Sequence, residues 1–296
     1  MFVINLLTLQ CLLHMKPTHL LLALAVFLNL EQASAQVNLS DRLTGAIAKG
    51  VKALTFSDAD AANLSLQAVN KMDAENKVAG SKDAYSVRLN MLFGKHANQN
   101  DLKLNYKVYL NKDVNAFATA DGSVRVFSGL MDIMDNNELL AVIGHEIGHV
   151  ANKDSKDAMK AAYTKAALID AAASQSDKVA TLSDGQLGQL ANAYLDSKHS
   201  RRQESEADLY SYDFMKTNGY NVNAVESAFT ILAKMSQGGE AGFLERMLSS
   251  HPDPTQRAAD AKQRAQADGL YKPYVKTALK TSVKKPTKLA KKPAKK

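Results

Sequence analysis

The stretch Leu139–Val150 reads LLAVIGHEIGHV, and it contains His145, Glu146 and His149 in the order H-E-x-x-H. On an α-helix, two residues four positions apart project from the same face, about one turn from each other. The two histidine rings can therefore share a metal ion, and zinc accepts neutral imidazole nitrogen as a ligand. A catalytic zinc site needs only three protein ligands when water fills the fourth position, and Glu146 would stand beside that water. The pattern predicts such a site if a third ligand exists.

The alternative interpretation of this stretch is a buried helix that contains two histidines by chance. The residues around the motif are apolar or glycine on every side, as in a helix without a solvated face. An ionised glutamate in such surroundings is costly unless it is paired, bound to a metal or functional. Gly144 and Gly148 each cost a helix interior about 1 kcal/mol relative to alanine, so they indicate a closely approaching partner.

The composition sets the frame for this helix. The chain has 296 residues, 46% hydrophobic and 23% charged, which is ordinary for a globular protein with one sizeable core. A fibrous or wholly disordered chain is excluded. The only cysteine is Cys11, so there is no disulfide framework. The sequence also has no internal repeat, no phosphate-binding glycine loop and no G-x-S-x-G nucleophile motif.

Residues 1–35 are predicted to be a signal peptide. Lys16 is followed by the apolar run Leu20–Leu30 and then by Ala33–Ala35, which reads ASA, the small-residue pattern that signal peptidase cleaves after. Cleavage there would give an exported, periplasmic protein, whichever early methionine starts translation. A transmembrane anchor is the alternative, but the apolar run is shorter than the roughly 20 residues that span a bilayer.

Residues 272–296 hold ten lysines, three prolines and no acidic residue, and they are predicted to form a disordered Lys-rich tail. The basic character of the chain therefore resides in this tail. For an exported protein we expect an anionic membrane or envelope surface as its partner, with peripheral membrane association, and no nucleic acid. The alternative is a solvated tail whose only role is solubility.

Between these ends, residues 36–100 are predicted to form an N-terminal helical layer, and residues 101–271 the domain that holds the metal site. Within the first segment, Asp58–Lys77 and Lys82–His96 space their apolar residues as helices do. Leu102–Leu110 alternates apolar and polar residues and is predicted to be a strand.

Two further strands are predicted at Val114–Ala118 and Ser123–Phe127, because these segments flank Asp121-Gly122, a strong hairpin signal. They place a small antiparallel sheet directly before the H-E-x-x-H helix, which Asn136 or Asn137 can cap. The predicted fold class is α+β, mainly α, with this sheet packed on the helix.

The stretch Ser200–Met215, SRRQESEADLYSYDFM, supplies a candidate for the third ligand. Glu204 and Asp208 are four residues apart and share a helix face, whereas Glu206 points elsewhere. Alanine and serine on the same face would let it approach the two glycines closely. Glu204 can then complete a His, His, Glu set, and Asp208 can accept a hydrogen bond from the outer nitrogen of a ligand histidine. Taken alone, the segment would suggest only a solvated acidic patch.

The two motifs, H-E-x-G-H at residues 145–149 and E-x-E-A-D at residues 204–208, resemble those of the gluzincin metallopeptidases, the class that includes HtpX and the CAAX-prenyl proteases. Asn105–Asp132 and Ser249–Asp260 also resemble this class, so the resemblance covers about residues 102–270. It implies a zincin-like metallopeptidase fold. The site residues that it implies are one zinc ion on His145, His149 and Glu204, with Glu146 as general base and Asp208 behind the ligands.

The resemblance also implies a role for His251. This residue opens an H-P-x-x-x-x-R element that ends at Arg257, and it is the candidate donor to the oxyanion of the reaction. A turn histidine before proline has a purely structural alternative. His96 and His199 are predicted to be surface residues.

The residues Asn115, Ala116, Phe117 and Ala118 are predicted to bind substrate. They would form the sheet edge that faces the metal, and an extended peptide can pair with the free N–H and C=O groups of an edge strand. Such pairing is largely blind to side chains, so it suits a protease of unfolded chains. The alternative is that Phe117 is simply a core residue of a structural strand.

We therefore expect a zinc-dependent endopeptidase of the bacterial cell envelope that hydrolyses unfolded or misassembled proteins by a metal-activated water, with Glu146 as general base. One alternative is a zinc-stabilised periplasmic chaperone or assembly factor with little or no proteolysis. Glu146 argues against it, because structural zinc needs no general base and usually has four closed ligands. A second alternative is an envelope-binding module that works through its tail.

Overall fold

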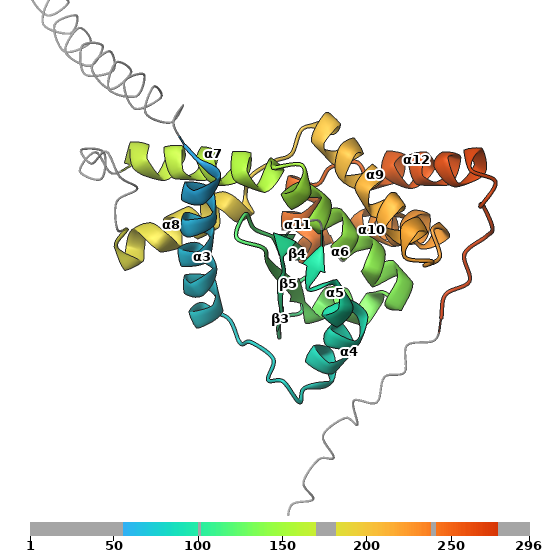
Figure 1. Cartoon of the computed structure of the whole chain (residues 1–296), viewed down its shortest axis with the longest axis horizontal. Coiled ribbons are helices and arrows are strands. Elements are labelled where there is room, and N and C mark those ends of the chain that lie inside the picture. The colour runs from blue at the N-terminus through green and yellow to red at the C-terminus, as the bar shows by residue number, and fades with distance from the viewer. Residues whose placement is uncertain (1–55, 100–101, 170–181, 238–240, 278–296) are drawn as a thin grey trace, which may run out of the picture. The chain divides into compact units, whose positions relative to one another are not determined.

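A computed structural model describes residues 56–99, 102–169, 182–237 and 241–277 of the chain. From Phe56 on, these residues belong to one compact unit (Figure 1). Its helices are α3 (Asp58–Glu75), α4 (Ala84–Phe93), the 3-10 helix η1 (Gly94–His96), α5 (Ser128–Ile133), α6 (Asn136–Ala151), α7 (Asp154–Ile169), α8 (Asp184–Leu195), α9 (Arg201–Thr217), α10 (Asn223–Gln237), α11 (Ala241–Ser250) and α12 (Pro254–Ala267). Its strands are β1 (Asn98–Gln99), β2 (Leu102–Lys103), β3 (Asn105–Tyr109), β4 (Ala116–Ala118) and β5 (Ser123–Phe127). The predicted α+β, mainly helical class is confirmed.

The larger sheet has the strand order β3-β5-β4. The hairpin prediction is confirmed, because β4 pairs antiparallel with β5 and Gly122 turns the chain between them with a φ of 85°. The prediction of a purely antiparallel sheet is wrong, since β3 pairs parallel with β5. The loop after β3 carries the chain across the sheet before β4 begins, so β5 returns into the space between them. A hairpin signal identifies only the local pair and is silent on this crossover.

Helices cover both faces of this sheet (Figure 1). Side chains that alternate along a strand point to opposite faces. On one face, Val124 and Val126 of β5 belong to the core that α6, α9 and α10 share. On the other face, Phe117 of β4 and Phe127 of β5 belong to a second core with α3, α7 and α8. The sheet therefore holds α6, the helix of the H-E-x-x-H motif, in the interior of the molecule.

The N-terminus of α6 is capped by Asp135, and the prediction of Asn136 or Asn137 as the cap is wrong. Asp135 and Glu138 form a capping box, in which each side chain accepts a hydrogen bond from the other's backbone N–H. Glu138 is fully buried, and Ser227 of α10 donates a hydrogen bond to it at 2.7 Å. Hydrogen bonds of the capping box and of Ser227 thus stabilise the N-terminus of the helix that carries the motif.

The start of the Lys-rich tail also holds this end of α6. Tyr274 donates hydrogen bonds to both carboxylate oxygens of Asp135, and the Thr277 backbone N–H donates to the same group at 2.7 Å. Lys276 lies 3.2 Å from Glu138. The predicted start of the disordered tail at Lys272 is therefore corrected, because residues 272–277 pack against the domain. The rest of the tail and the predicted signal peptide lie outside the described residues.

Helix α9 packs along α6, and Gly144 and Gly148 of α6 make the predicted close approach possible. A Cβ atom on Gly144 would lie 3.0 Å from the Phe214 ring, and one on Gly148 would lie 3.1 Å from the Ala207 Cα and carbonyl oxygen. Ser211, one turn after Ala207, donates a hydrogen bond to the Ala141 carbonyl of α6 at 2.7 Å. The small-residue face of α9 thus meets the glycine face of α6 as predicted.

We expect Gly148→Ala to lower the free energy of unfolding relative to Gly188→Ala by about 1–3 kcal/mol, the usual cost of overpacking. Both positions lie inside helices, so both gain the same helix propensity, but a Cβ on Gly188 of α8 meets only the Lys71 Cε atom at 3.9 Å. Urea denaturation of the two variants measures the difference. Equal stabilities would show that α6 and α9 can separate without cost.

In the described residues, no helix is long and apolar enough to cross a membrane.

Candidate metal centre

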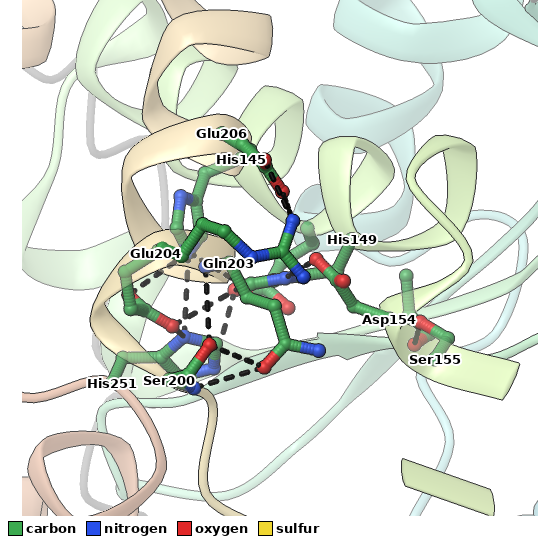
Figure 2. A network of polar contacts seen from close by, with 12 residues as sticks. His145, His149, Asp154, Ser155, Ser200, Gln203, Glu204, Glu206 and His251 are labelled. Atoms are coloured by element: carbon green, nitrogen blue, oxygen red, sulfur yellow. Dashed lines mark hydrogen bonds and ion pairs between the residues drawn. The ribbon is translucent and has the colours of Figure 1, made fainter. Parts of the chain in front are cut away.

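The predicted ligands converge in the interior of the domain (Figure 2). The Nε2 atoms of His145 and His149 on α6 lie 3.0 Å apart. Glu204 on α9 brings one carboxylate oxygen within 3.4 Å of His149 Nε2 and the other within 3.6 Å of His145 Nε2. All three side chains are buried. The sequence prediction of a His, His, Glu cluster thus describes the arrangement in the structure.

Local sequence explains how α9 presents Glu204. Ser200 caps the helix and forms a capping box with Gln203, so the helix begins just before the ligand position. Glu206, two residues further, is on the outer side and pairs with Arg202 at 2.7 Å. The acidic residue that faces α6 is therefore Glu204.

Each metal-facing histidine has a carboxylate on its outer nitrogen. Asp208 Oδ1 lies 2.8 Å from His145 Nδ1, as the sequence predicted for a ligand histidine. Asp154 Oδ2 lies 2.9 Å from His149 Nδ1, and sequence reasoning missed this residue. Such partners keep the Nε2 atoms available for a metal and orient the rings. The chain returns to His149 only because Lys153, with a φ of 66°, turns it sharply between α6 and α7.

We expect Asp154→Asn to weaken metal binding by about 10- to 100-fold, the usual cost of losing an outer partner of a ligand histidine. Asp157→Asn is the matched control, because Asp157 lies in the same first turn of α7 and is exposed. Competition with a chromogenic chelator measures both affinities. Equal affinities in the two variants would mean that the Asp154 carboxylate has no influence on the metal.

The charges of the cluster are set by burial and by these partners. Burial, reinforced by Arg257, lowers the pKa of His145 to about 3. Burial also disfavours charge on His149, but hydrogen bonds to Asp154 and Glu204 outweigh it and raise the pKa of His149 to about 9. At neutral pH one ring is therefore neutral and the other carries an additional proton. A metal must displace that proton, because only neutral imidazole binds.

Arg257 on α12 lies beneath the cluster. It donates hydrogen bonds to both oxygens of Asp208, and its Nη1 atom lies 2.8 Å from Glu204 Oε2. Burial raises the pKa of Asp208, but Arg257 and His145 outweigh it and lower the value to about 2. Contacts with His149 and His251 likewise outweigh burial and hold the pKa of Glu204 well below its usual range. Both carboxylates are thus ionised at neutral pH.

Glu146 stands beside the cluster without a hydrogen-bond partner of its own. Its Oε1 atom is buried and makes no hydrogen bond among the described residues, and burial raises the pKa of Glu146. Glu146 Oε1 has one long ion-pair contact among the described residues, with His251 Nε2 at 3.8 Å. A buried carboxylate oxygen without a hydrogen bond is costly, which indicates that it acts on a group at the site.

His251 is buried at the same centre, at the start of the loop between α11 and α12. Its Nδ1 atom lies 3.0 Å from Glu204 Oε1 and 3.3 Å from His145 Nε2, so it can also offer a ligand atom. The predicted proximity of His251 to the reaction centre agrees with this position. Arg257, the other end of the H-P-x-x-x-x-R element, contacts the carboxylates of Glu204 and Asp208 instead.

The prediction that His199 and His96 are surface residues is wrong. The His199 ring stacks on His149 with ring centroids 3.9 Å apart, at the mouth of the cluster. His96 is buried between α4 and α9, where it lies 2.7 Å from the Tyr220 hydroxyl and edge-on to Phe214. Neither histidine belongs to a sequence motif, and only the tertiary fold shows their surroundings.

The donor set fits a zinc ion. Ligand atoms around a tetrahedral zinc ion, at bond lengths of about 2.0–2.1 Å, lie roughly 3.3 Å apart. The Nε2 atoms of His145 and His149 lie 3.0 Å apart, Glu204 Oε1 lies 3.4 Å from His149 Nε2, and Glu204 Oε2 lies 3.6 Å from His145 Nε2. Each spacing is close to this value, and the two carboxylate oxygens face different rings. Two imidazoles and one carboxylate are a ligand set of catalytic zinc sites.

The predicted substrate strand lies next to this cluster. β4 is an edge of its sheet, and Asn115, Ala116, Phe117 and Ala118 line a small cavity together with Glu146, His149 and His199. The edge strand β4 and Glu146, the candidate general base, therefore line the same cavity. Phe117 also packs in the core with Phe127, so its side chain is structural whatever its backbone binds.

Comparison with known proteins agrees with the geometry. The chain matches peptidase family M48 over residues 85–265. It is 41% identical to the metalloprotease LoiP of Escherichia coli over 232 residues, which cover 78% of this chain and 90% of LoiP. It is 40% identical to the metalloprotease YcaL of E. coli over 254 residues, which cover 84% of this chain and 98% of YcaL.

More distant relatives include the beta-barrel assembly-enhancing protease of E. coli, 28% identical over 189 residues, or 61% of this chain and 38% of that protein. The family match spans every residue of the buried cluster, from His145 to Arg257. The chain belongs to peptidase family M48 and is a metalloendopeptidase.

Proposed function

We propose that this chain is a zinc-dependent endopeptidase of the bacterial cell envelope and that it hydrolyses unfolded or misassembled proteins. One observation carries the chemistry. The buried carboxylate of Glu146, whose Oε1 atom makes no hydrogen bond among the described residues, stands beside two imidazoles and a carboxylate with the spacing of a zinc site. Nitrogen, nitrogen and oxygen donors suit zinc, and Glu146 is an additional carboxylate that a structural site would not need.

A zinc ion held by His145, His149 and Glu204 would make a water molecule more acidic and polarise the carbonyl group of the scissile bond. Glu146 accepts the proton of the attacking water as its oxygen bonds to the carbonyl carbon, and then delivers that proton to the amide nitrogen as the C–N bond breaks. Burial suits this role, because it raises the pKa of Glu146 and so makes it a stronger base.

We assign His251 to the oxyanion of this reaction. Its Nε2 atom is directed toward the Glu146 side of the centre, 3.8 Å from Oε1, while Nδ1 faces Glu204. A ring in this position can donate a hydrogen bond to the carbonyl oxygen as negative charge develops on it. Arg257 lowers the pKa of Asp208 and lies 2.8 Å from Glu204 Oε2, so its guanidinium is engaged by these two carboxylates.

The backbone of β4 is suited to receive an extended substrate. In its register with β5, Phe117 lies opposite Arg125, and the Phe127 N–H donates to the Asn115 carbonyl. The odd-numbered residues therefore pair with β5, and the polar groups of Ala116 and Ala118 face away from it. The Ala118 carbonyl already accepts hydrogen bonds from Ser155 and Tyr194. The Ala116 groups and the Ala118 N–H remain for a peptide.

Proline at Ala116 or at Ala118, tested singly, should weaken cleavage of an unfolded substrate mainly through KM. Each change removes an outward N–H donor at modest cost to an edge strand, so zinc content and thermal stability should stay nearly unchanged. Steady-state kinetics with a fluorogenic peptide measure the effect. If both variants cleave as the wild type does, β4 is not the docking edge.

The envelope location rests on the sequence and on the relatives. A signal peptide cleaved after Ala35 would export the chain to the periplasm, and a Lys-rich tail can attract an anionic membrane surface. The name of the beta-barrel assembly-enhancing protease refers to the assembly of β-barrels. Unfolded or misassembled envelope proteins are therefore the substrates that we propose.

The competing function is a zinc-stabilised chaperone or assembly factor with little proteolysis. An unfolded β-barrel protein incubated with the zinc-loaded chain separates the two. A protease produces fragments with new termini, which mass spectrometry identifies. A chaperone only suppresses aggregation of the intact substrate, and this outcome would overturn the proposed function.

A further inference from the structure

A second, larger cavity continues the space around Glu146. It has a volume of about 440 Å³, and it begins at Asn115, which also lines the small cavity beside Glu146. The same three segments wall both cavities: the chain leading into β4, the end of α8, and the end of α11. The two cavities thus adjoin at Asn115, and we call them together the groove. Its size is within the range of ligand-binding sites.

The walls of the larger cavity carry mainly negative charge. Asp113 before β4 and Glu245 on α11 are exposed to it, and neither carboxylate belongs to an ion pair among the described residues. Asp196 at the end of α8 pairs with Arg246 at 3.3 Å, so these two charges offset each other across the groove. Two unpaired carboxylates therefore remain beside the proposed substrate edge.

The register of β4 relates this cavity to the substrate. Antiparallel pairing is slightly more stable per residue than parallel pairing, so a peptide that adds to β4 is expected to run opposite to it. The part of the peptide that follows the scissile bond then lies toward the N-terminal side of β4. Asp113 is three residues before Ala116, so a peptide whose scissile bond is placed opposite Ala116 has its first three positions after that bond beside the cavity.

We propose that this cavity is a specificity subsite for a lysine or arginine side chain of the substrate, within the first three residues after the scissile bond. The inference rests on the proposed endopeptidase function and on substrate addition to β4. Main-chain pairing with β4 discriminates poorly between sequences, and the unpaired carboxylates of Asp113 and Glu245 supply a side-chain preference. Because both are exposed, the preference is modest: we expect about two- to fivefold for each carboxylate and roughly fivefold to tenfold for both.

The test uses the zinc-loaded full chain and internally quenched peptides with one common cleavage site. The three positions before that site and the three positions after it carry lysine, glutamine or glutamate, one position at a time, and mass spectrometry identifies the cleaved bond. The variant is Asp113→Asn with Glu245→Gln, which keeps the shape of both side chains. The control is Glu206→Gln with Asp213→Asn, which removes the same charge from the half-exposed Glu206 and the exposed Asp213 of α9, both outside the groove.

We expect the wild type and the control to prefer lysine over glutamine, and glutamine over glutamate, by kcat/KM, with a preference that shrinks in added salt. The groove variant should cleave the glutamine peptides as the wild type does and lose the lysine preference. Glu245→Lys combined with Asp113→Asn leaves one added positive charge in the cavity and should reverse the preference.

Cleavage of the glutamine peptides without any lysine preference in the wild type overturns the subsite and leaves the endopeptidase function intact. A lysine preference confined to positions before the scissile bond overturns the antiparallel placement. Failure of the zinc-loaded wild type to cleave any peptide overturns the proposed function and the subsite together.

Discussion

Glu146→Gln is expected to lower peptide hydrolysis by at least about 100-fold while the chain still binds its metal, because removal of a general base typically costs 100- to 10,000-fold. Glutamine has the size and shape of glutamate but cannot accept the proton of the attacking water. The Glu146 carboxylate is not among the ligand atoms that converge between α6 and α9, so the metal should remain in place. The measurement is kcat/KM on a fluorogenic peptide at matched metal content.

A second variant separates the proton transfer from packing. Glu146→Asp keeps a carboxylate but withdraws it by one methylene, so it should retain more activity than Glu146→Gln although it leaves more empty space. Thermal unfolding should be similar for both, since Glu146 Oε1 makes no hydrogen bond among the described residues. Near wild-type hydrolysis by Glu146→Gln at full metal content would refute the mechanism.

The parts of the site that follow from local periodicity could be predicted from the sequence. Helical spacing alone places His145 beside His149 and Glu204 beside Asp208. The pairing of the two helices was also accessible, because Gly144 and Gly148 are costly in a helix unless another backbone approaches them. The two helical spacings and the two glycines were therefore enough to predict which side chains meet at the centre of the site.

Other parts depend on turns and on tertiary packing, which leave little local signal. Asp154 reaches His149 only through the positive φ of Lys153, a conformation that lysine rarely adopts. The parallel pairing of β3 with β5 depends on the path of the chain between them. His199 stacks on His149 because the segment before α9 passes the mouth of the cluster. None of these contacts has a characteristic spacing in the sequence.

The start of the Lys-rich tail shows that composition alone does not predict where an ordered segment ends. Residues 272–277 share the lysine and proline content of the segment that follows, so composition placed all of them in one disordered tail. Tyr274 distinguishes residues 272–277 from the rest of the tail, because its hydroxyl hydrogen-bonds to the carboxylate of Asp135, the buried N-cap residue of α6. Individual hydrogen bonds to a buried helix cap can therefore order a short segment that has no apolar core of its own.

Glu204→Ala is expected to remove most of the bound zinc, from about one ion per chain in the wild type, and to abolish measurable hydrolysis. The two histidines alone leave a site with two protein ligands, whereas catalytic zinc sites have three. The loss should also leave Arg257 without one of its two buried carboxylate partners, and removing one partner of a buried ion pair typically costs about 3–5 kcal/mol. Both zinc content and stability should therefore fall together.

The chain supplies its own control for this substitution at Glu206. The two glutamates are separated by one residue on α9, but Glu206 is half-exposed and pairs with Arg202 one turn before it, an arrangement worth about 0.3–0.5 kcal/mol. Glu206→Ala should therefore keep its zinc, its activity and nearly all of its stability. Metal analysis by mass spectrometry after gel filtration, with urea denaturation, distinguishes the two variants. Full zinc in Glu204→Ala would contradict the ligand assignment, and zinc loss confined to Glu206→Ala would transfer it to the outer glutamate.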